Sequence, residues 1–363
     1  MEQDKNLQTP EEEVLEAPET EETSLDAAAV MSEPKRSSFK DFLIKIKFDQ
    51  WKGWIYLAPA LVLLLIFTVW PIFNTVRIAF SENYSSAGEI AGETFSFGFK
   101  NFTKVLSYSG FKTCLKNTLL LTVLTVPIST VLALLIAVCL NAIRPLQRFL
   151  QTIFFLPYVT NSIAIGMVFA AMFSMSGSHF GTEDAYIQTA GIMNNILGIF
   201  NIPPVNWMNE GSTYAANITV MVIYIVWNAL PFKILILLGG LQSVNKQYYE
   251  AAKIDSTPRW RVFTKITVPL LSPMIAYVVI TGFIGGFKEY SSIVGVFGEK
   301  MGPVGSIENL TAGGSLNTMV GFVYDSLASD SQGRASAAAL ILFAIIFVVT
   351  MINLYVSKKK THY

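Results

Sequence analysis

Residues 117–143, NTLLLTVLTVPISTVLALLIAVCLNAI, decide the class of fold, because this stretch contains no charged residue. A helix needs about 20 apolar residues to cross the hydrocarbon core of a bilayer. In that medium a helix pairs its backbone polar groups internally, whereas an open strand or loop cannot. The stretch therefore predicts a membrane-spanning helix.

Five further stretches show the same pattern. They cover residues 53–76, 149–173, 214–241, 266–287 and 335–357. Pro231 and Lys233 interrupt the stretch at 214–241, where we expect Pro231 to kink the helix and Lys233 to snorkel toward the inner interface. The chain is thus predicted to be an all-α membrane protein with six transmembrane helices.

The composition supports this prediction. Of the 363 residues, 52% are hydrophobic and 14% are charged, whereas a soluble domain has about 25% charged residues. Such a balance argues against a disordered chain, a nucleic-acid-binding domain and a disulfide-stapled secreted module.

Charge is unevenly distributed along the chain. Residues 1–33 hold eleven acids and one base, so the remainder carries an excess of ten bases. We expect an acidic disordered cytoplasmic tail at 1–34, a basic juxtamembrane segment at 35–53, a six-helix permease domain at 54–357 and a cytoplasmic C-terminal tail at 358–363. The basic segment is either an amphipathic helix on the inner leaflet or an ordinary basic flank of the first span.

The basic residues predict the orientation. With a cytoplasmic N-terminus, 17 of the 26 bases lie in cytoplasmic segments, and the loop at 174–213 has none. Cytoplasmic loops of membrane proteins carry the excess of Lys and Arg. We therefore expect a multi-pass protein of the bacterial cytoplasmic membrane with both termini inside.

The cytoplasmic loop at 242–265 has the most specific sequence. Asn245 is placed to cap a helix that runs to about Asp255. A turn follows, in which Pro258 is expected at the first position of a second helix. Near the middle of the first helix the side chains of Ala251 and Ala252 are small and that of Glu250 is charged. A short helix of this kind can dock in a groove of another protein.

This loop resembles the cytoplasmic signature of a known family, the permease subunits of binding-protein-dependent ATP-binding-cassette sugar importers (maltose and multiple-sugar type). The matching residues are Glu250-Ala251-Ala252-Lys253-Ile254-Asp255, then Trp260 and Phe263, then Ile266-Thr267-Val268-Pro269. Ser256 stands where the family usually has Gly, and Ser lacks the freedom of Gly at positive φ. Other motifs, such as Asn101-Phe102-Thr103 and Phe154-Phe155-Leu156-Pro157, extend the resemblance over residues 54–357.

The resemblance implies the type I importer permease fold and a half-transporter. It implies a second permease subunit, expected to be a different chain, two cytoplasmic ATP-binding subunits and an extracytoplasmic sugar-binding protein. The residues implied in ATPase docking are Glu250, Ala251, Ala252, Asp255 and Ser256. Besides these proteins the chain contacts membrane lipid, and we expect no nucleic acid partner.

The chain is not expected to be an enzyme. It lacks a Gly-x-x-x-x-Gly-Lys-Ser/Thr phosphate loop, so ATP and Mg would be hydrolysed by the partner ATPase. We expect no catalytic residue, no metal site and no cofactor bound by this chain.

Polar residues near the spans are candidates for the substrate pathway. They are Asn228, Lys288, Glu289, Tyr290 and Ser292. The alternative for Asn228 is a hydrogen bond to a neighbouring helix, and the alternative for the other four is an external interfacial segment with a local ion pair. If Lys288 faced the pathway, an acidic sugar would become conceivable as substrate.

The outer loops at 81–116, 174–213 and 288–334 are expected to form the platform for the binding protein. Tyr108, Tyr186, Trp207 and Tyr324 are candidate anchors there, or else aromatic residues of the membrane interface. An ion-coupled secondary transporter is the alternative function, but no acid interrupts the six spans and the halves show no repeat.

Overall fold

The computed structural model describes residues 53–143, 147–179, 186–189, 191–302 and 316–360. The predicted acidic tail at 1–34, all but the last residue of the basic segment at 35–53, and residues 361–363 lie outside this range. The chain divides into two units, Met1–Trp70 and Pro71–Tyr363. In the first unit the described residues, 53–70, are helical and include a π-helical turn at Leu65–Val69.

Four helices are long and apolar enough to cross a membrane, and the number rises to six if each of two bent helix pairs is one span. The four are Gly53–Phe80, α5 (Ser109–Ala142), α9 (Tyr214–Ser243) and α16 (Gln332–Lys360). They confirm the predicted spans at 53–76, 117–143, 214–241 and 335–357. Pro231 lies inside the continuous α9.

The third and fifth predicted spans are bent. Helix α6 (Gln147–Val159) meets α7 (Ser162–Phe173) at 98°, and Asn161 starts α7 by accepting a hydrogen bond from the Ile163 amide at 2.8 Å. The stretch Arg259–Leu270 meets α13 (Ser272–Phe287) at 67°. Both predicted stretches, 149–173 and 266–287, are therefore apolar enough for a span but are broken in the middle. Asn161 caps the start of the second helix in the first stretch, and in the second Pro273, which lacks a donor, lies at the start of the new helix.

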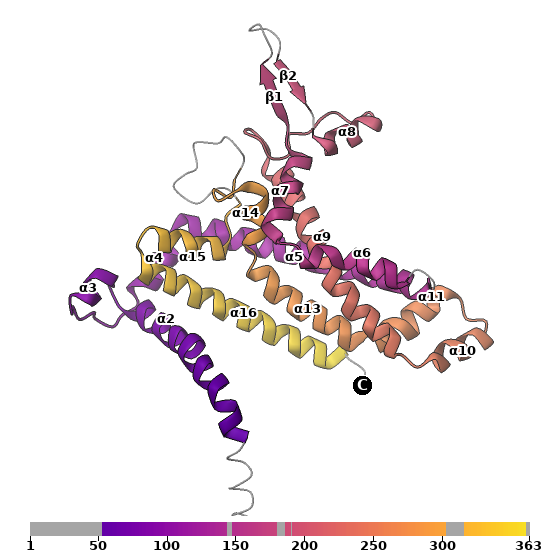
Figure 1. Ribbon diagram of the computed structural model, residues 1–363, viewed down its shortest axis with the longest axis horizontal. Helices are drawn as coiled ribbons and strands as arrows, with labels where there is room; N and C mark the ends of the chain where they lie inside the picture. The colour runs from indigo at the N-terminus through magenta and orange to yellow at the C-terminus, as the bar shows by residue number, and fades with distance from the viewer. Residues whose placement is uncertain (1–52, 144–146, 180–185, 190, 303–315, 361–363) are drawn as a thin grey trace, which may run out of the picture. The chain divides into compact units, whose positions relative to one another are not determined.

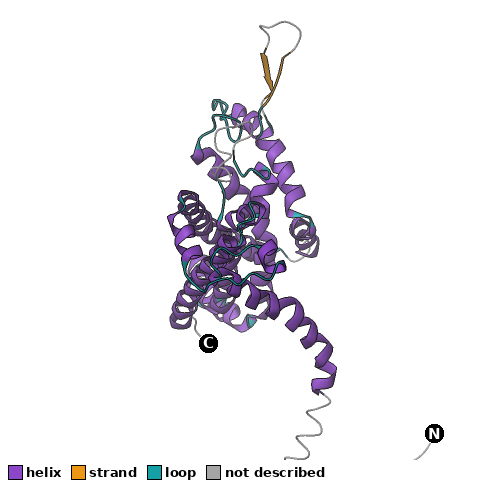
Figure 2. Cartoon of the chain, turned by 90° about the vertical axis from the view of Figure 1, so that its left-hand side faces the viewer, coloured by secondary structure: helices purple, strands orange, loops and turns teal. Residues whose placement is uncertain are grey.

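Shorter elements join these helices. They are α2 (Trp70–Phe80), α3 (Ser86–Ile90), α4 (Lys100–Ser107), α8 (Ile192–Ile199), α10 (Lys246–Ile254), α11 (Arg259–Val262), η2 (Phe263–Thr267), α12 (Val268–Leu270), α14 (Ser291–Phe297) and α15 (Met319–Ala328). In the otherwise helical part that the structure describes, β1 (Ser176–His179) and β2 (Tyr186–Thr189) form an antiparallel hairpin, which Figure 2 shows projecting from the helices.

The long helices of the second unit alternate in direction. Figure 1 shows α4 and α15 at one end of the bundle, and α10 and α11 at the other, with α14 beside α7. The starts of α5, α9 and α16 and the end of α13 therefore share one end of the bundle. This agrees with the alternation of loops predicted from the bases.

Small and polar residues let the helices pack closely. Buried hydroxyls on α5 bond back to the carbonyl four residues earlier, as Thr122 does to Thr118 at 2.7 Å, so they expose no unpaired polar group. Opposite them lies Gly286 of α13, where a Cβ atom would come within 2.8 Å of Thr122. Close contacts of this kind, rather than a large apolar core, hold helices together in a membrane.

Candidate functional site

A polar cleft of about 400 Å³ lies between the membrane helices. Helices α5, α9 and α13 and the break between α6 and α7 form its walls. Its lining residues are Thr125, Val126, Ser129, Tyr158, Thr160, Ser162, Ile225, Asn228, Ala229, Phe232, Lys233, Thr281, Gly282, Gly285, Gly286 and Glu289. The lining mixes hydroxyls, an amide, aromatic rings and one charge of each sign.

Lys233 is the cation of this cleft. Its side chain is 4% exposed, and its ammonium donates to Ser129 Oγ at 2.7 Å, Thr130 Oγ1 at 3.0 Å and the Val126 carbonyl at 3.2 Å. All three acceptors belong to α5, so Lys233 ties α9 to α5. The expectation that Lys233 snorkels to the inner interface is therefore wrong, because the hydroxyls of α5 satisfy the ammonium inside the bundle.

Aromatic rings line one side of the cleft. The rings of Tyr158 and Phe232 stack with centroids 5.9 Å apart and planes inclined by 18°, and Phe232 also approaches Tyr277 at 6.5 Å. The two lining rings, Tyr158 and Phe232, come from α6 and α9, whereas Tyr277 of α13 lies outside the lining. Flat apolar faces beside hydroxyl and amide groups are the lining expected of a site that takes a polyhydroxylated ligand.

The break between α6 and α7 is held by Tyr224. This side chain is fully buried on α9, and its hydroxyl lies 3.0 Å from Ser162 Oγ and also donates to the Ser162 carbonyl. Its ring packs edge-on against Phe169, with centroids 4.9 Å apart. The Tyr224 side chain of α9 thus holds Ser162, and with it this polar part of the cleft wall, in place.

The cleft brings together two of the five predicted pathway residues, Asn228 and Glu289. Glu289 is positioned by its own chain, since its Oε1 accepts from the Ser292 amide at 3.1 Å and its carbonyl accepts from Thr318 Oγ1 at 2.9 Å. Lys288 is exposed at the end of α13, and Tyr290 stacks on Tyr324 at 4.6 Å. Neither Lys288 nor Tyr290 lines the cleft. Ser292 is buried and does not line it either, but its amide donates a hydrogen bond to Glu289, which does.

Several lining residues were not predicted. Tyr158 and Phe232 lie in ordinary apolar stretches, so nothing local marks them. The hydroxyls of α5 do carry a signal, because Thr118, Thr122, Thr125 and Ser129 recur at helical spacing in an otherwise apolar span. That pattern identifies the polar face of α5.

The second candidate site is the hairpin formed by α10 and α11. Asn245 caps α10 as predicted, accepting from the Gln247 amide at 3.0 Å. The helix ends at Asp255, and Ser256 then adopts φ +52°, the conformation that Gly takes most easily. Pro258 is the N-cap of α11, one position before the expected one, because its ψ of 143° is extended.

The two alanines of the hairpin face different ways. Ala251 is exposed, whereas Ala252 is buried within its own chain. On the same helix, the Tyr249 hydroxyl lies 3.3 Å from Thr267 Oγ1 of η2. The predicted docking residues Glu250, Asp255 and Ser256 are exposed. Two large apolar side chains join them at the surface, Ile254 at 84% and Trp260 at 72% exposure.

A bundle of apolar helices around a polar cleft, with an exposed hairpin at one end, defines a multi-span membrane transport protein. Residues 129–362 match the family described as the inner membrane component of binding-protein-dependent transport systems, and the chain belongs to that family. The matched region contains the hairpin and all the lining residues of the cleft except Thr125 and Val126.

Known proteins resemble the chain over most of its length. The probable ABC transporter permease protein MG188 of Mycoplasma genitalium is 30% identical, with 81% of this chain and 82% of that protein covered. The arabinooligosaccharides transport system permease protein AraP of Bacillus subtilis is 28% identical, with 90% of this chain and 94% of that protein covered.

A solved structure shares the fold. A chain of a bacterial alginate ABC transporter, crystallised with an alginate pentasaccharide-bound periplasmic protein, superposes with a TM-score of 0.69 at 20% identity, over 88% of this chain and 98% of that one. The predicted type I importer permease fold is thereby confirmed.

Proposed function

We propose that this chain is one permease subunit of an ATP-binding-cassette importer that moves a sugar or oligosaccharide across the cytoplasmic membrane. The observation that carries the proposal is the polar, aromatic-lined cleft inside a bundle whose fold is that of an importer permease. The transport role printed in the name of the relative AraP supports a carbohydrate as the cargo.

Within the cleft, we assign Asn228 and Glu289 to substrate contact, with the hydroxyls of Thr125 and Ser129 beside them. Sugars present many hydroxyl groups that both donate and accept, so amide, carboxylate and hydroxyl partners match them. Lys233 and Glu289 give the described lining one charge of each sign, which suits a neutral sugar. Ser292 acts through Glu289, while Lys288 and Tyr290 remain predicted members of the pathway beyond the cleft.

The hairpin is the proposed ATPase-docking element. Glu250 supplies charge, Ala251 permits close approach, and the exposed Ile254 and Trp260 supply apolar anchors of the kind that dominate protein interfaces. Asp255 and Ser256 shape the turn between the two helices. In this reading the chain binds no nucleotide, and ATP with Mg is hydrolysed in the partner.

The assembly follows from the half-transporter reading. A second, different permease completes the pathway, two ATPase subunits dock on the hairpins, and an extracytoplasmic binding protein delivers the sugar. The excess of bases near the hairpin and the termini supports an orientation with both termini cytoplasmic. The loops at the other end of the bundle then face outward.

The alternative, an ion-coupled secondary transporter, is not favoured. Membership of a binding-protein-dependent family and the exposed hairpin both support transport driven by a separate ATPase subunit. Proteoliposomes that hold both permeases and the ATPase, with the binding protein outside, test the choice. We expect sugar uptake that requires ATP hydrolysis, whereas uptake driven by an ion gradient without ATP would support the alternative.

A further inference from the structure

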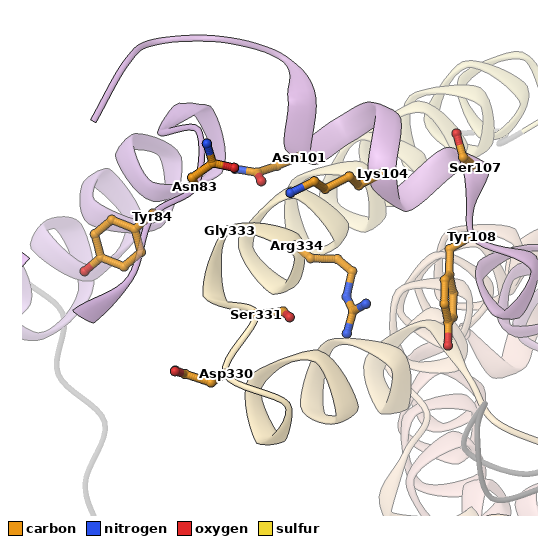
Figure 3. Close-up of a pocket in the computed structure, with 10 residues that line it drawn as sticks. All are labelled: Asn83, Tyr84, Asn101, Lys104, Ser107, Tyr108, Asp330, Ser331, Gly333 and Arg334. Atoms are coloured by element: carbon orange, nitrogen blue, oxygen red, sulfur yellow. The ribbon is translucent and has the colours of Figure 1, made fainter. Parts of the chain in front are cut away.

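A second pocket lies at the opposite end of the bundle from the hairpin. It has a volume of about 540 Å³, and Figure 3 shows its ten lining residues around the start of α16 and the C-terminal half of α4. The lining residues are Asn83, Tyr84, Asn101, Lys104, Ser107, Tyr108, Asp330, Ser331, Gly333 and Arg334. The transport cleft shares none of them.

Arg334 is held in a fixed orientation in this pocket. Its Nε donates to Ser326 Oγ at 3.1 Å and one terminal nitrogen donates to Ser329 Oγ at 2.8 Å. The guanidinium lies 5.4 Å from the ring centre of Tyr108 and 5.9 Å from that of Phe322. A guanidinium has five N–H donors, so this arrangement leaves donors for a planar anionic group.

The positive charge of the pocket is not balanced by an ion pair. Within the residues that the structure describes, the one ion pair joins Arg77 to Glu89, so neither Lys104 nor Arg334 has such a partner. Asp325 on α15 is near enough to attract Arg334 electrostatically, but it forms no ion pair with it, and its Oδ2 accepts from Asn317 Nδ2 at 2.6 Å. Asp330 belongs to the lining, but Figure 3 shows its carboxylate pointing away from Arg334.

We propose that this pocket receives an acidic side chain, Asp or Glu, of the extracytoplasmic binding protein. A carboxylate can accept two parallel bonds from the guanidinium of Arg334 while the exposed ammonium of Lys104 approaches from α4. The inference rests on the proposed function and orientation, which place this end of the bundle outside the cell.

A lipid phosphate is the competing ligand, and the lining favours a protein. Asn83, Tyr84, Asp330 and Ser331 lie in turns beyond the helix ends at Phe80 and Gln332. No lining residue has an aliphatic side chain, whereas acyl chains would need an apolar wall next to the headgroup. An acidic side chain carried on a protein loop needs no such wall.

The test measures the affinity of the binding protein for the complete transporter in nanodiscs. The binding protein is the one that stimulates ATP hydrolysis by the wild-type complex. Lys104→Glu reverses an exposed charge, and Arg334→Gln removes the guanidinium. Lys100→Glu is the matched control, because Lys100 is also exposed and lies one turn earlier on α4. We expect Kd to rise at least tenfold for the first two and less than twofold for the control.

A charge-reversing substitution of the partner's acid to Lys should restore binding to Lys104→Glu. Equal affinities for Lys104→Glu, Lys100→Glu and wild type would overturn the proposal while leaving the transport function intact. The pocket variants could instead lose the part of basal ATP hydrolysis that depends on anionic lipid while their affinity for the binding protein stays unchanged. That result would assign the pocket to lipid and would also overturn the proposal. If no binding protein stimulated the wild-type complex, the proposed function itself would fail.

Discussion

Lys233 is the residue on which the cleft depends most. A buried ammonium is costly unless it is hydrogen-bonded, and here three acceptors of α5 provide those bonds. Both hydroxyl acceptors also donate to carbonyls of their own helix, Ser129 to Thr125 and Thr130 to Val126. They would therefore stay partnered if the lysine were removed.

This leads to a prediction for Lys233→Met. Met fills similar space and leaves no hydroxyl unpaired, so the melting temperature in detergent should stay within a few degrees. Sugar uptake should fall about tenfold, since the cleft loses its cation and a charged contact contributes about 1.5–3 kcal/mol. Lys253→Met on exposed α10 controls for loss of a lysine. Normal uptake by Lys233→Met would show that the lysine only joins two helices.

Gly285 allows the cleft to be narrowed without disturbing the fold. It lines the cleft, and a Cβ atom there would meet nothing within 4 Å. We expect Gly285→Leu to fold and insert normally but to block uptake, because the new side chain occupies the pathway. Gly239→Leu on α9 is the control, since that position is equally open and does not line the cleft.

The result is read from uptake together with expression level. Full uptake by Gly285→Leu would mean that the substrate passes elsewhere. Unlike Gly285→Leu and Gly239→Leu, Gly286→Leu should lower the yield of folded protein, because a Cβ atom at position 286 would lie 2.8 Å from Thr122.

Residue identities predicted part of this site. Asn228 stands out as an amide inside an apolar span, and it lines the cleft. Lys233 was misplaced because a lysine near a helix end usually snorkels, and its acceptors lie more than one hundred positions away on α5. Tyr158 and Phe232 resemble any lipid-facing aromatic until their helices are brought together.

At the scale of elements, the turn between α10 and α11 depends on one backbone conformation. Ser256 adopts φ +52°, which costs a non-glycine residue about 1 kcal/mol and a β-branched residue more. Ser256→Val should therefore distort the hairpin and lower ATPase association, whereas Ser256→Gly should preserve or improve it. Thr257→Val is the matched control, because position 257 does not have a positive φ.

Co-purification of the ATPase with each variant measures the effect. Equal recovery for Ser256→Val and Thr257→Val would show that the turn geometry does not matter for docking. Loss with Ser256→Gly would contradict the strain argument directly, since Gly adopts this conformation freely.

The loop that contains α3 offers a pH-dependent contact. Hydrogen bonds from the Tyr84 hydroxyl and the Arg77 guanidinium lower the pKa of Glu89 from its ordinary value of 4.5. A lowered pKa in the folded state means that the carboxylate contributes stability above that ordinary value and loses it as the pH falls through the lowered one. Hydrogen exchange of α3 should therefore accelerate at acidic pH.

Glu89→Gln is the control for this prediction. It cannot titrate, so the acid-dependent increase in exchange should disappear in the variant. An increase of the same size in Glu89→Gln would assign the effect to another group. The contribution is expected to be small, because both Arg77 and Glu89 are exposed.

Element existence was predicted more successfully than element shape. The uncharged stretches at 117–143 and 214–241 needed only length and composition to be recognised as α5 and α9. The 98° break at Asn161 was not predicted, because the flanking sequence stays apolar and hydropathy does not report a side-chain cap such as that of Asn161. Bends of this kind depend on a few hydrogen bonds that hydropathy does not report.

At the scale of the whole molecule, the cleft and the hairpin occupy different parts of one bundle, joined by α9 and α13. Helix α9 carries Asn228 and Lys233 and leads into α10, while α13 carries Gly285 and ends at Phe287, two residues before Glu289. A movement of the hairpin can therefore reach the cleft along α9 directly, and along α13 through the 67° bend at Leu271.

Charge reversal at the hairpin tests this connection. Glu250→Lys should abolish transport and weaken ATPase association by about 2–5 kcal/mol if a buried charged contact is lost. Lys246→Glu, at the start of the same helix, should have a smaller effect. Ala251→Asp is the better small-residue variant, since Ala252 is buried and Ala252→Asp would disturb the hairpin itself. Full ATPase recovery with Glu250→Lys would remove the docking role.

The most direct measurement is cysteine cross-linking at Ile254, the most exposed apolar residue of the hairpin. In a Cys139→Ala background, Ile254→Cys should form an adduct with the ATPase subunit in intact membranes, and Ile90→Cys, 89% exposed at the other end, should not. The account predicts an adduct whose yield changes when ATP is added. No adduct with the ATPase, or an adduct with the extracytoplasmic binding protein, would contradict it.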